Sequence, residues 1–392
     1  MRPGVSLGSV ALAAVCAGCG ARSPLGDLGS PEASAATTTG PGTTPSQPHA
    51  SRLALGYGLS CAVMTDGTVR CWGYDGFHQL GRAGSSPCAG PAAALGPCAV
   101  RPTPVPALAG VARLAIGATH ACALAEDGAV RCWGTGPGAG AESGAVVEDP
   151  TLVSAPGSPV VDLAADLDNT CVLHADGTVS CWGDDAYGQL GLGSTTGVGE
   201  VSQLAMGHNF TCGRMADQTV RCSGLDDEGQ LGNGAMSGEE AHQVPSAVVG
   251  LSGITQIVAG YDHACALTSD GTVSCWGSEL RLVPWQVTSI EGLADVSQVA
   301  AGEAFTCALR TDGSVACWGV NLEGEIGDGT TAFRGAPTQV AGLRGVVQLA
   351  VRGFHACALT DSSAVYCWGL NAHGEVGDGT TVDRPVARRI DL

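Results

Sequence analysis

The chain has 392 residues and a formal net charge of −19, and all 18 of its basic residues are arginine. The absence of lysine excludes Schiff-base and P-loop chemistry, and because the arginines form no basic stripe, nucleic-acid binding is not expected. Aromatic residues make up only 4% of the chain whereas glycine occurs 60 times, so large core side chains are scarce.

Residues 1–19 have the pattern of an export signal. Arg2 is followed by an apolar stretch from Val5 to Ala17, which is too short to span a bilayer and typical of a signal peptide. The stretch ends in Cys16-Ala-Gly-Cys19, which resembles the cleavage box of bacterial lipoproteins, although Cys16 stands where leucine is usual. This pattern predicts lipidation of Cys19 and attachment to the outer membrane or cell surface through the lipid anchor only. An ordinary signal peptide that is cut nearby is the alternative.

Residues 20–50 are rich in serine, threonine, proline, alanine and glycine. A segment of this composition cannot form a packed core, so we interpret it as a tether. As a flexible chain it would reach about 30 Å on average.

From residue 51 onward one cassette recurs seven times, with its clearest copy at residues 260–277. In each copy two cysteines are ten positions apart and flank a short turn, which is Asp-Gly in five copies. A three-residue hairpin loop with glycine in the left-handed position places these cysteines opposite each other on antiparallel strands, within disulfide distance. The predicted pairs are Cys61 with Cys71, Cys122 with Cys132, Cys171 with Cys181, Cys212 with Cys222, Cys265 with Cys275, Cys307 with Cys317, and Cys357 with Cys367.

Cys88 and Cys98 are the two cysteines that remain once the signal segment and the seven cassettes are counted. They bracket an insertion after the first repeat, and we predict that they form an eighth bond. An even count without a leftover cysteine is expected for a chain in an oxidising compartment.

The fourth repeat departs most from the pattern, with Gln218 in place of the turn glycine and Ser223 in place of the tryptophan that follows the second cysteine elsewhere. We therefore predict that it is the weakest repeat. A Pro-x-x-Val strand ends most repeats but does not precede the first, while residues 384–392 resemble such a strand. This predicts that the C-terminal strand closes the ring by joining the first blade.

Seven units of about 40–50 residues are typical of a propeller or another repeat array. The cassettes resemble the repeats of the regulator of chromosome condensation family over residues 51–392. The resemblance implies an all-β fold, a seven-bladed β-propeller of four-stranded blades. The paired cysteines depart from the eukaryotic founding members and suggest an exported relative.

Candidate chemistry is sparse. His120, His263 and His355 each precede a cassette cysteine by two positions, which favours structural hydrogen bonds over a metal site because four repeats lack the histidine. Residues 327–331 and 377–381 resemble calcium loops but lack the alternating acidic ligands, so we expect turns. No catalytic motif is found, and we predict a chain that is not an enzyme and needs no metal or cofactor.

Loops after the Trp-Gly strand are the longest and lie on one side of a propeller, so they are the candidate binding region. Residues 77–104 and 223–244 are the largest of them. The second offers the acidic residues Asp226, Asp227, Glu228, Glu239 and Glu240. Simple tolerated insertion is the alternative for both loops.

These patterns together favour a monomeric cell-envelope lipoprotein that acts as a protein- or ligand-binding scaffold with an unknown partner. The alternatives are an inhibitor of a secreted enzyme and a polysaccharide-acting propeller enzyme. Guanine-nucleotide exchange, the activity of the family's founding members, would require a GTPase that an exported chain does not meet, so it would apply only as a similarity-based label.

Overall fold

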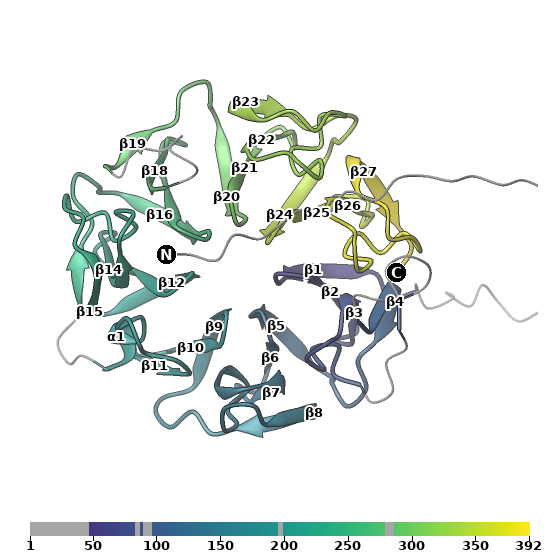
Figure 1. Ribbon diagram of the computed structural model, residues 1–392, viewed down its shortest axis with the longest axis horizontal. Helices are drawn as coiled ribbons and strands as arrows, with labels where there is room; N and C mark the ends of the chain where they lie inside the picture. Colours follow the sequence, from purple (N-terminus) through teal and green to yellow (C-terminus); the bar gives the residue numbers. More distant parts are fainter. Residues whose placement is uncertain (1–46, 83–86, 89–95, 195–198, 279–285) are drawn as a thin grey trace, which may run out of the picture. The chain divides into compact units, whose positions relative to one another are not determined.

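The structure is a computed structural model that describes residues 47–82, 87–88, 96–194, 199–278 and 286–392. Residues 47–392 form one compact unit. Their strands make seven antiparallel sheets, which surround a central axis like the blades of a propeller (Figure 1). The predicted fold class is therefore confirmed, whereas the export signal, Cys19 and most of the tether lie outside the described residues.

Each blade begins with the strand nearest the axis and continues outward in chain order. The first strands are β1 (Ala50–Leu55), β5 (Val111–Ile116), β9 (Val160–Asp166), β12 (Val201–Gly207), β16 (Ile254–Ala259), β20 (Val296–Ala301) and β24 (Val346–Arg352). The second strands are β2 (Leu59–Met64), β6 (His120–Ala125), β10 (Asn169–His174), β13 (Phe210–Met215), β17 (His263–Thr268), β21 (Phe305–Arg310) and β25 (His355–Thr360).

The third and fourth strands complete the blades. The third strands are β3 (Val69–Tyr74), β7 (Val130–Thr135), β11 (Val179–Trp182), β14 (Val220–Asp226), β18 (Val273–Gly277), β22 (Val315–Gly319) and β26 (Val365–Gly369). The fourth strands are β4 (Cys98–Pro104), β8 (Val146–Val153), β15 (Gly238–Ala247), β19 (Thr288–Ser289), β23 (Arg334–Gln339) and β27 (Arg384–Ile390). The third blade has three strands within the described residues, where the prediction has four.

The cassette forms the hairpin between the second and third strands with the predicted register. In the fifth blade Cys265 faces Cys275 and Leu267 faces Val273, and Gly271 adopts the left-handed conformation with φ of 83°. Gln218 and Ser363 take the same conformation in the fourth and seventh blades, with φ of 66° and 60°. The hairpin therefore keeps its geometry where the glycine is replaced, at the expense of backbone strain that a glycine avoids.

All eight predicted cysteine pairs are bonded. The seven cassette bonds join Cys61 to Cys71, Cys122 to Cys132, Cys171 to Cys181, Cys212 to Cys222, Cys265 to Cys275, Cys307 to Cys317, and Cys357 to Cys367. The Cα atoms of these seven pairs are 4.0–4.1 Å apart, and those of the eighth pair, Cys88 and Cys98, are 5.2 Å apart.

The cassette cysteines are buried except Cys181, which is partly exposed. Each bond lies between the second and third strands of its blade, as the register predicts. The bonded sulfurs add compact core volume in a chain with few aromatic residues.

The C-terminal strand does not join the first blade, so that prediction is wrong. β27 pairs with β26 and is the outer strand of the seventh blade, while the first blade is complete with β1 to β4. The reason is the phase of the repeat: each blade's inner strand precedes its cassette, and residues 50–55 already supply that strand for the first blade. The two ends of the propeller nevertheless meet, because residues 48–50 and 389–392 line one surface pocket.

Within the described residues two short helices interrupt the pattern, the 3-10 helix η2 (Pro137–Ala139) and α1 (Gly191–Ser194). α1 follows the third blade and contacts β13, β14 and β15 of the fourth. Leu192 of this helix is buried among Leu204, Met206 and Met215. The helix thus packs against the blade that lacks its tryptophan, which the sequence pattern did not predict.

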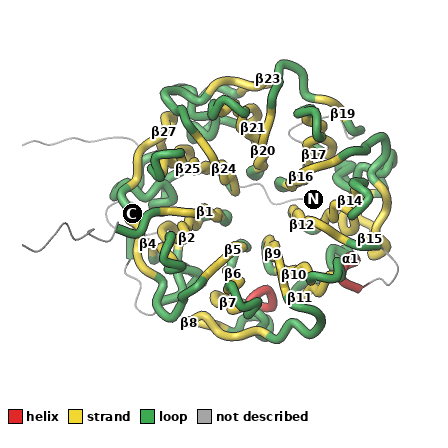
Figure 2. The backbone as a smooth tube through the Cα atoms, turned by 180° about the vertical axis from the view of Figure 1, so that it is seen from behind, coloured by secondary structure: helices red, strands yellow, loops and turns green. Residues whose placement is uncertain are grey.

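Because neighbouring strands of each blade are antiparallel, the loops between them lie on two faces of the propeller; Figure 2 views the propeller from the side opposite to Figure 1. We call the side that carries the loops between first and second strands and between third and fourth strands the loop face. The opposite side carries the cassette turns and the blade-to-blade connections, and we call it the hairpin face.

Candidate functional site

Buried glutamine and glutamate side chains fix the loops between the third and fourth strands. In five blades such a side chain accepts a hydrogen bond from the backbone N–H of the residue two positions earlier, at 2.8–3.0 Å. The acceptors are Gln79, Gln189, Gln230, Glu325 and Glu375, and the donors are Phe77, Tyr187, Glu228, Glu323 and His373. The donor residues are varied in chemistry and are placed by the acceptors on the loop face.

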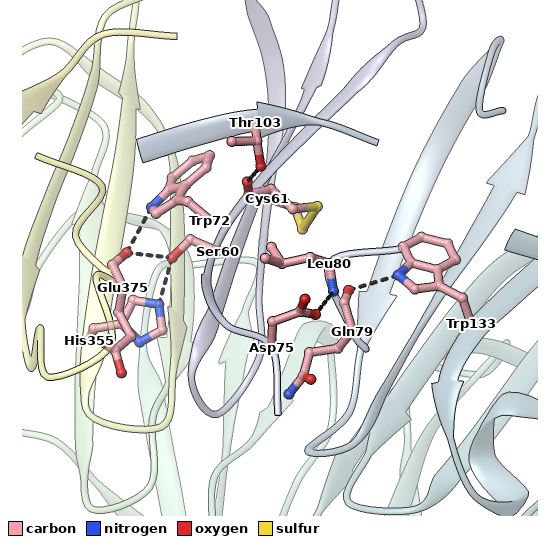
Figure 3. The surroundings of a disulfide bond; sticks show 11 residues. Ser60, Cys61, Trp72, Asp75, Gln79, Leu80, Thr103, Trp133, His355 and Glu375 are labelled. Atoms are coloured by element: carbon pink, nitrogen blue, oxygen red, sulfur yellow. Dashed lines mark hydrogen bonds between the residues drawn. A yellow bond between two sulfur atoms is a disulfide. The ribbon is translucent and has the colours of Figure 1, made fainter. Parts of the chain in front are cut away.

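A second acceptor closes each of these loops. An aspartate or asparagine accepts the N–H of an apolar residue five positions later, as Asp75 does from Leu80 at 2.8 Å (Figure 3). Asp226 plays this part in the fourth blade by accepting from Leu231 at 3.0 Å, and its other oxygen accepts from Asn233 and Ser237. Asp226 is fully buried, so this member of the predicted acidic set supports the loop rather than facing solvent.

The other predicted acidic residues take different positions. Asp227 is half-buried and accepts a hydrogen bond from Gln230 Nε2 at 3.0 Å, while Glu228 is exposed. Glu240 is also exposed, on β15, and the side chain of Glu239 lies outside the described residues. The structure therefore leaves Glu228 and Glu240 available on this part of the surface, and their binding role stays a prediction.

Tryptophan indoles join neighbouring blades beneath these loops. Trp72 donates its Nε1–H to the Glu375 carbonyl at 2.8 Å, and Trp133 donates to the Gln79 carbonyl at 2.7 Å (Figure 3). Trp276 and Trp368 make the same contact with the preceding blade. The same glutamine or glutamate thus holds its own loop through its side chain and accepts the indole N–H of the next blade through its carbonyl.

The three cassette histidines also join blades, as the structural interpretation predicts. His120, His263 and His355 each place Nε2 2.7–2.9 Å from a hydroxyl of the next blade, on Thr170, Thr306 and Ser60 respectively. Burial lowers the pKa of each imidazole to about 4. They are therefore neutral at neutral pH and act as uncharged hydrogen-bond partners.

The axial channel is a cavity of ≈ 360 Å³ lined by the first strands of the blades. Arg352, the last residue of β24, lies buried at its loop-face end and crosses the axis. It forms an ion pair with Asp166 of the third blade and donates to the carbonyls of Met206 and Ala259 at 3.2 and 2.9 Å. Its guanidinium also lies 5.3 Å from the ring centroid of Tyr57, whose pKa is raised to about 12, chiefly by burial.

Loops between first and second strands surround this end of the channel. Tyr261 donates its backbone N–H to the Glu303 carbonyl at 3.3 Å, and Glu303 donates to Gly353 at 2.8 Å. The ring of His208 lies 3.9 Å from that of Tyr261. Burial raises the pKa of the half-buried Glu303 carboxyl. Aromatic and acidic side chains thus border the loop-face end of the channel, where Arg352 is paired with Asp166.

Several loops of the loop face carry exposed large apolar side chains. Six of them lie in, or directly border, loops between third and fourth strands: Phe77, Val146, Met236, Leu322, Phe333 and Val382. Leu322 is 74% and Phe333 50% exposed. Apolar side chains placed on a firmly bonded set of loops are typical of a protein-binding surface.

The fold and the cassette define a class, the seven-bladed propeller built from disulfide-bonded repeats. The sequence matches the family described as regulator of chromosome condensation (RCC1) repeat over residues 51–79, 111–136, 160–189, 254–280, 296–325 and 346–375. The chain is therefore a member of the RCC1-like repeat proteins. The fourth repeat is not among the matched segments, in agreement with its departures at Gln218 and Ser223. No curated protein matches the sequence.

Solved structures show the same fold. Human WBSCR16 is 20% identical with a TM-score of 0.72, and the match covers 83% of this chain and 94% of that one. Prp20p from Saccharomyces cerevisiae, whose binding to Gsp1p and histones is named with its structure, is 21% identical with a TM-score of 0.70 and 88% of each chain covered. The ectodomain of the receptor kinase CR4 from Physcomitrella patens is 20% identical with a TM-score of 0.54, over 82% of this chain and 74% of that one.

Sequence patterns did not single out Arg352 or Asp166. Both stand where the first strands of other repeats end in small or apolar residues, as in Ala301-Gly302 and Ile116-Gly117. A charged residue at an otherwise apolar repeat position was the available signal.

Among the described helices, none is long and apolar enough to cross a membrane.

Proposed function

We propose that this chain is an exported, envelope-attached binding scaffold that docks a protein partner on its loop face. The observation that carries the proposal is the set of exposed apolar side chains on the loop face, together with the exposed acidic residues Glu228 and Glu240 of the fourth blade. Interfaces combine apolar contacts with a polar rim, and the rigid bonding of these loops lowers the entropy cost of binding.

Export is supported by the disulfides, because eight such bonds indicate an oxidising environment. Attachment rests on the predicted lipidation of Cys19. We expect the Cys19→Ser variant to leave the membrane fraction while the propeller keeps its fold by circular dichroism. Unchanged fractionation of this variant would show that the anchor lies elsewhere or that an ordinary signal peptide is used.

Binding is tested by comparing the two faces. The loop-face variant with Leu322→Ser and Phe333→Ser and the hairpin-face variant with Leu152→Ser and Val161→Ser each replace two exposed apolar residues. We expect cross-linking in outer-membrane extract, followed by mass spectrometry, to lose one specific partner with the first variant only. Loss with the second variant alone would place the interface on the hairpin face.

A further inference from the structure

The junction of the seventh and first blades carries an ordered polar and aromatic group on the loop face. We call Tyr74, Phe77, His373 and Glu375 the seam cluster. The ring centroids of Tyr74 and His373 are 4.7 Å apart in an edge arrangement, and those of Tyr74 and Phe77 are 5.9 Å apart. Phe77 is 39% exposed, whereas Glu375 is fully buried.

Covalent and backbone bonds hold this cluster in place. Tyr74 is the cross-strand partner of Cys98, which is bonded to Cys88. Pro87 and Pro97 form a β-bridge beside that bond. Tyr74 is therefore paired with a disulfide-bonded residue, so its ring is held in place before a partner binds, which lowers the entropy lost on binding.

The Glu375 carboxylate binds both the backbone and the imidazole of His373. Oε2 accepts the backbone N–H of His373 at 2.8 Å, and Oε1 lies 3.0 Å from Nδ1. A carboxylate only accepts hydrogen bonds, so Nδ1 carries the proton that it donates to Oε1. In the neutral imidazole the other nitrogen, Nε2, is then a hydrogen-bond acceptor with a fixed orientation.

The neighbouring loops add acceptors and apolar groups. Leu322 and Val382, 74% and 59% exposed, lie in the equivalent loops of the sixth and seventh blades, with the Glu323 carboxylate beside Leu322 in the chain.

Two arginines of these loops are engaged internally. Arg334 Nε donates to Asp328 and Arg384 Nε donates to Asp378, both at 2.6 Å. Their charges are matched within the loops, so the acceptor Nε2 and the half-buried Glu323, whose side chain also hydrogen-bonds the Glu325 carboxyl, can complement a donor-rich, positively charged partner.

We propose that the partner is a basic protein segment that packs an apolar side chain beside Phe77 and donates an N–H to Nε2 of His373. This inference rests on the proposed docking at the loop face and adds the partner's chemistry and its anchor point. A glycan would make little use of the exposed aliphatic residues Leu322 and Val382, whereas a protein segment buries them.

The test uses a random peptide library selected against the full-length chain, followed by affinity measurements on the enriched peptides. We expect enriched peptides with a net positive charge and at least one large apolar residue. His373→Phe keeps a ring against Tyr74 but removes the acceptor, and it should weaken binding at least about tenfold. Val161→Ser on the hairpin face is the matched control and should leave affinity unchanged.

A second variant reverses the polarity of the hydrogen bond without removing the histidine. Glu375→Gln introduces the residue that other blades carry here, at Gln79, Gln189 and Gln230, so the loop has a native precedent for folding. The amide oxygen then accepts the backbone N–H and the amide nitrogen faces Nδ1, so Nδ1 becomes the acceptor and Nε2 the donor. Nitrogen chemical shifts of the imidazole should report this tautomer change, and binding of the basic peptides should fall about as much as with His373→Phe.

The outcomes separate this inference from the proposed function. Enrichment of acidic or uncharged peptides would overturn the inference of a basic partner. Basic peptides that tolerate His373→Phe and Glu375→Gln but lose binding with Leu322→Ser would also overturn it. In that second case docking at the loop face would still stand. Peptides that lose binding only with Val161→Ser would overturn both. Binding of selected oligosaccharides at His373 in place of peptides would contradict the proposal that the partner is a protein.

Discussion

Glu325 occupies a position at which three other blades carry glutamine. It is fully buried, it accepts the N–H of Glu323 at 3.0 Å, and its own carbonyl binds Trp368. Burial raises its pKa to about 8 from an ordinary value of 4.5. A protonated carboxyl is nearly isosteric with the glutamine amide, so at neutral pH this glutamate fills the role of glutamine in the neutral form.

This shift predicts how the Glu325→Gln variant responds to pH. Because the folded pKa is raised, the contribution of the group is fully present below pH 4.5 and is lost as pH rises from 4.5 to about 8. We expect the variant to match the wild type in unfolding free energy near pH 4.5 and to exceed it by about 1–3 kcal/mol above pH 8. Urea unfolding across this range measures the difference, with the exposed Glu126→Gln as control. An equal difference at all pH values would show that ionisation is not the cause.

At the scale of elements, the contacts between blades repeat the same chemistry. Indole and imidazole groups of the hairpins bind carbonyls and hydroxyls of adjacent blades, as at Trp72 and His355 around the first disulfide (Figure 3). Glutamine side chains pair with the inner strands in the same way: Gln256 accepts the N–H of Val299 and donates to its carbonyl. Neutral, hydrogen-bonded polar groups thus supplement the small apolar core.

The buried histidines predict acid sensitivity. For His263 the folded pKa is lowered to about 4 from 6.5, so the unfolded chain binds more protons between these values and stability falls as pH drops from 6.5 to 4. We expect His263→Gln, which keeps a hydrogen-bonding group toward Thr306, to reduce the slope of unfolding free energy against pH by up to about 1.4 kcal/mol per pH unit. Thermal and urea unfolding in this range provide the measurement. The exposed His49→Gln should keep the wild-type slope, and an unchanged slope in both variants would contradict the assignment.

The two kinds of disulfide are expected to differ in their effect. Replacing Cys265 and Cys275 together by serine opens a buried hairpin bond, and we expect a loss of about 2–3 kcal/mol in unfolding free energy. Replacing Cys88 and Cys98 by serine acts on a loop outside the blade hairpins, so the loss should be smaller. Peptide mapping without reduction first establishes that all eight bonds are present. Equal losses in the two variants would show that the loop bond contributes to the propeller core.

Local spacing was enough to predict the hairpins and their disulfides, because a ten-residue interval around Asp270-Gly271 permits one register. How the elements pack against one another was harder to predict from the sequence. The packing of α1 against the fourth blade depends on contacts between blades that only the assembled propeller creates. The C-terminal strand β27 was predicted in the wrong blade because similar strands fit either neighbour. The buried role of Asp226 could not be distinguished from surface charge in a run of three acidic residues.

At the scale of the whole molecule, the ring closes without exchange of a strand between the last blade and the first. Side-chain contacts join them instead: Gln348 accepts the N–H of Leu53 at 3.0 Å, and Ser60 donates to the Glu375 carbonyl at 2.8 Å. Comparable glutamine contacts occur between other blades, as for Gln203 and Ile257. The junction between the last and the first blade is therefore built like the other junctions. All of these contacts join neighbouring blades, so a contact across the axis would link blades that are not otherwise joined.

Arg352 is such a contact, because it links the seventh blade to the third, fourth and fifth across the channel. Asp166 is only 1% exposed, so loss of the guanidinium would leave a buried carboxylate without its counter-charge. Removing one member of a buried pair typically costs about 3–5 kcal/mol, and we expect a loss of that size in the unfolding free energy of Arg352→Met. Combining Arg352→Met with Asp166→Asn should recover a large part of it, because the charge is removed with its partner. Arg389→Met, which replaces an exposed arginine of β27, is the control and should unfold like the wild type. A double variant no more stable than Arg352→Met would mean that the hydrogen bonds to Met206 and Ala259, rather than the ion pair, hold the opposite sides of the ring together.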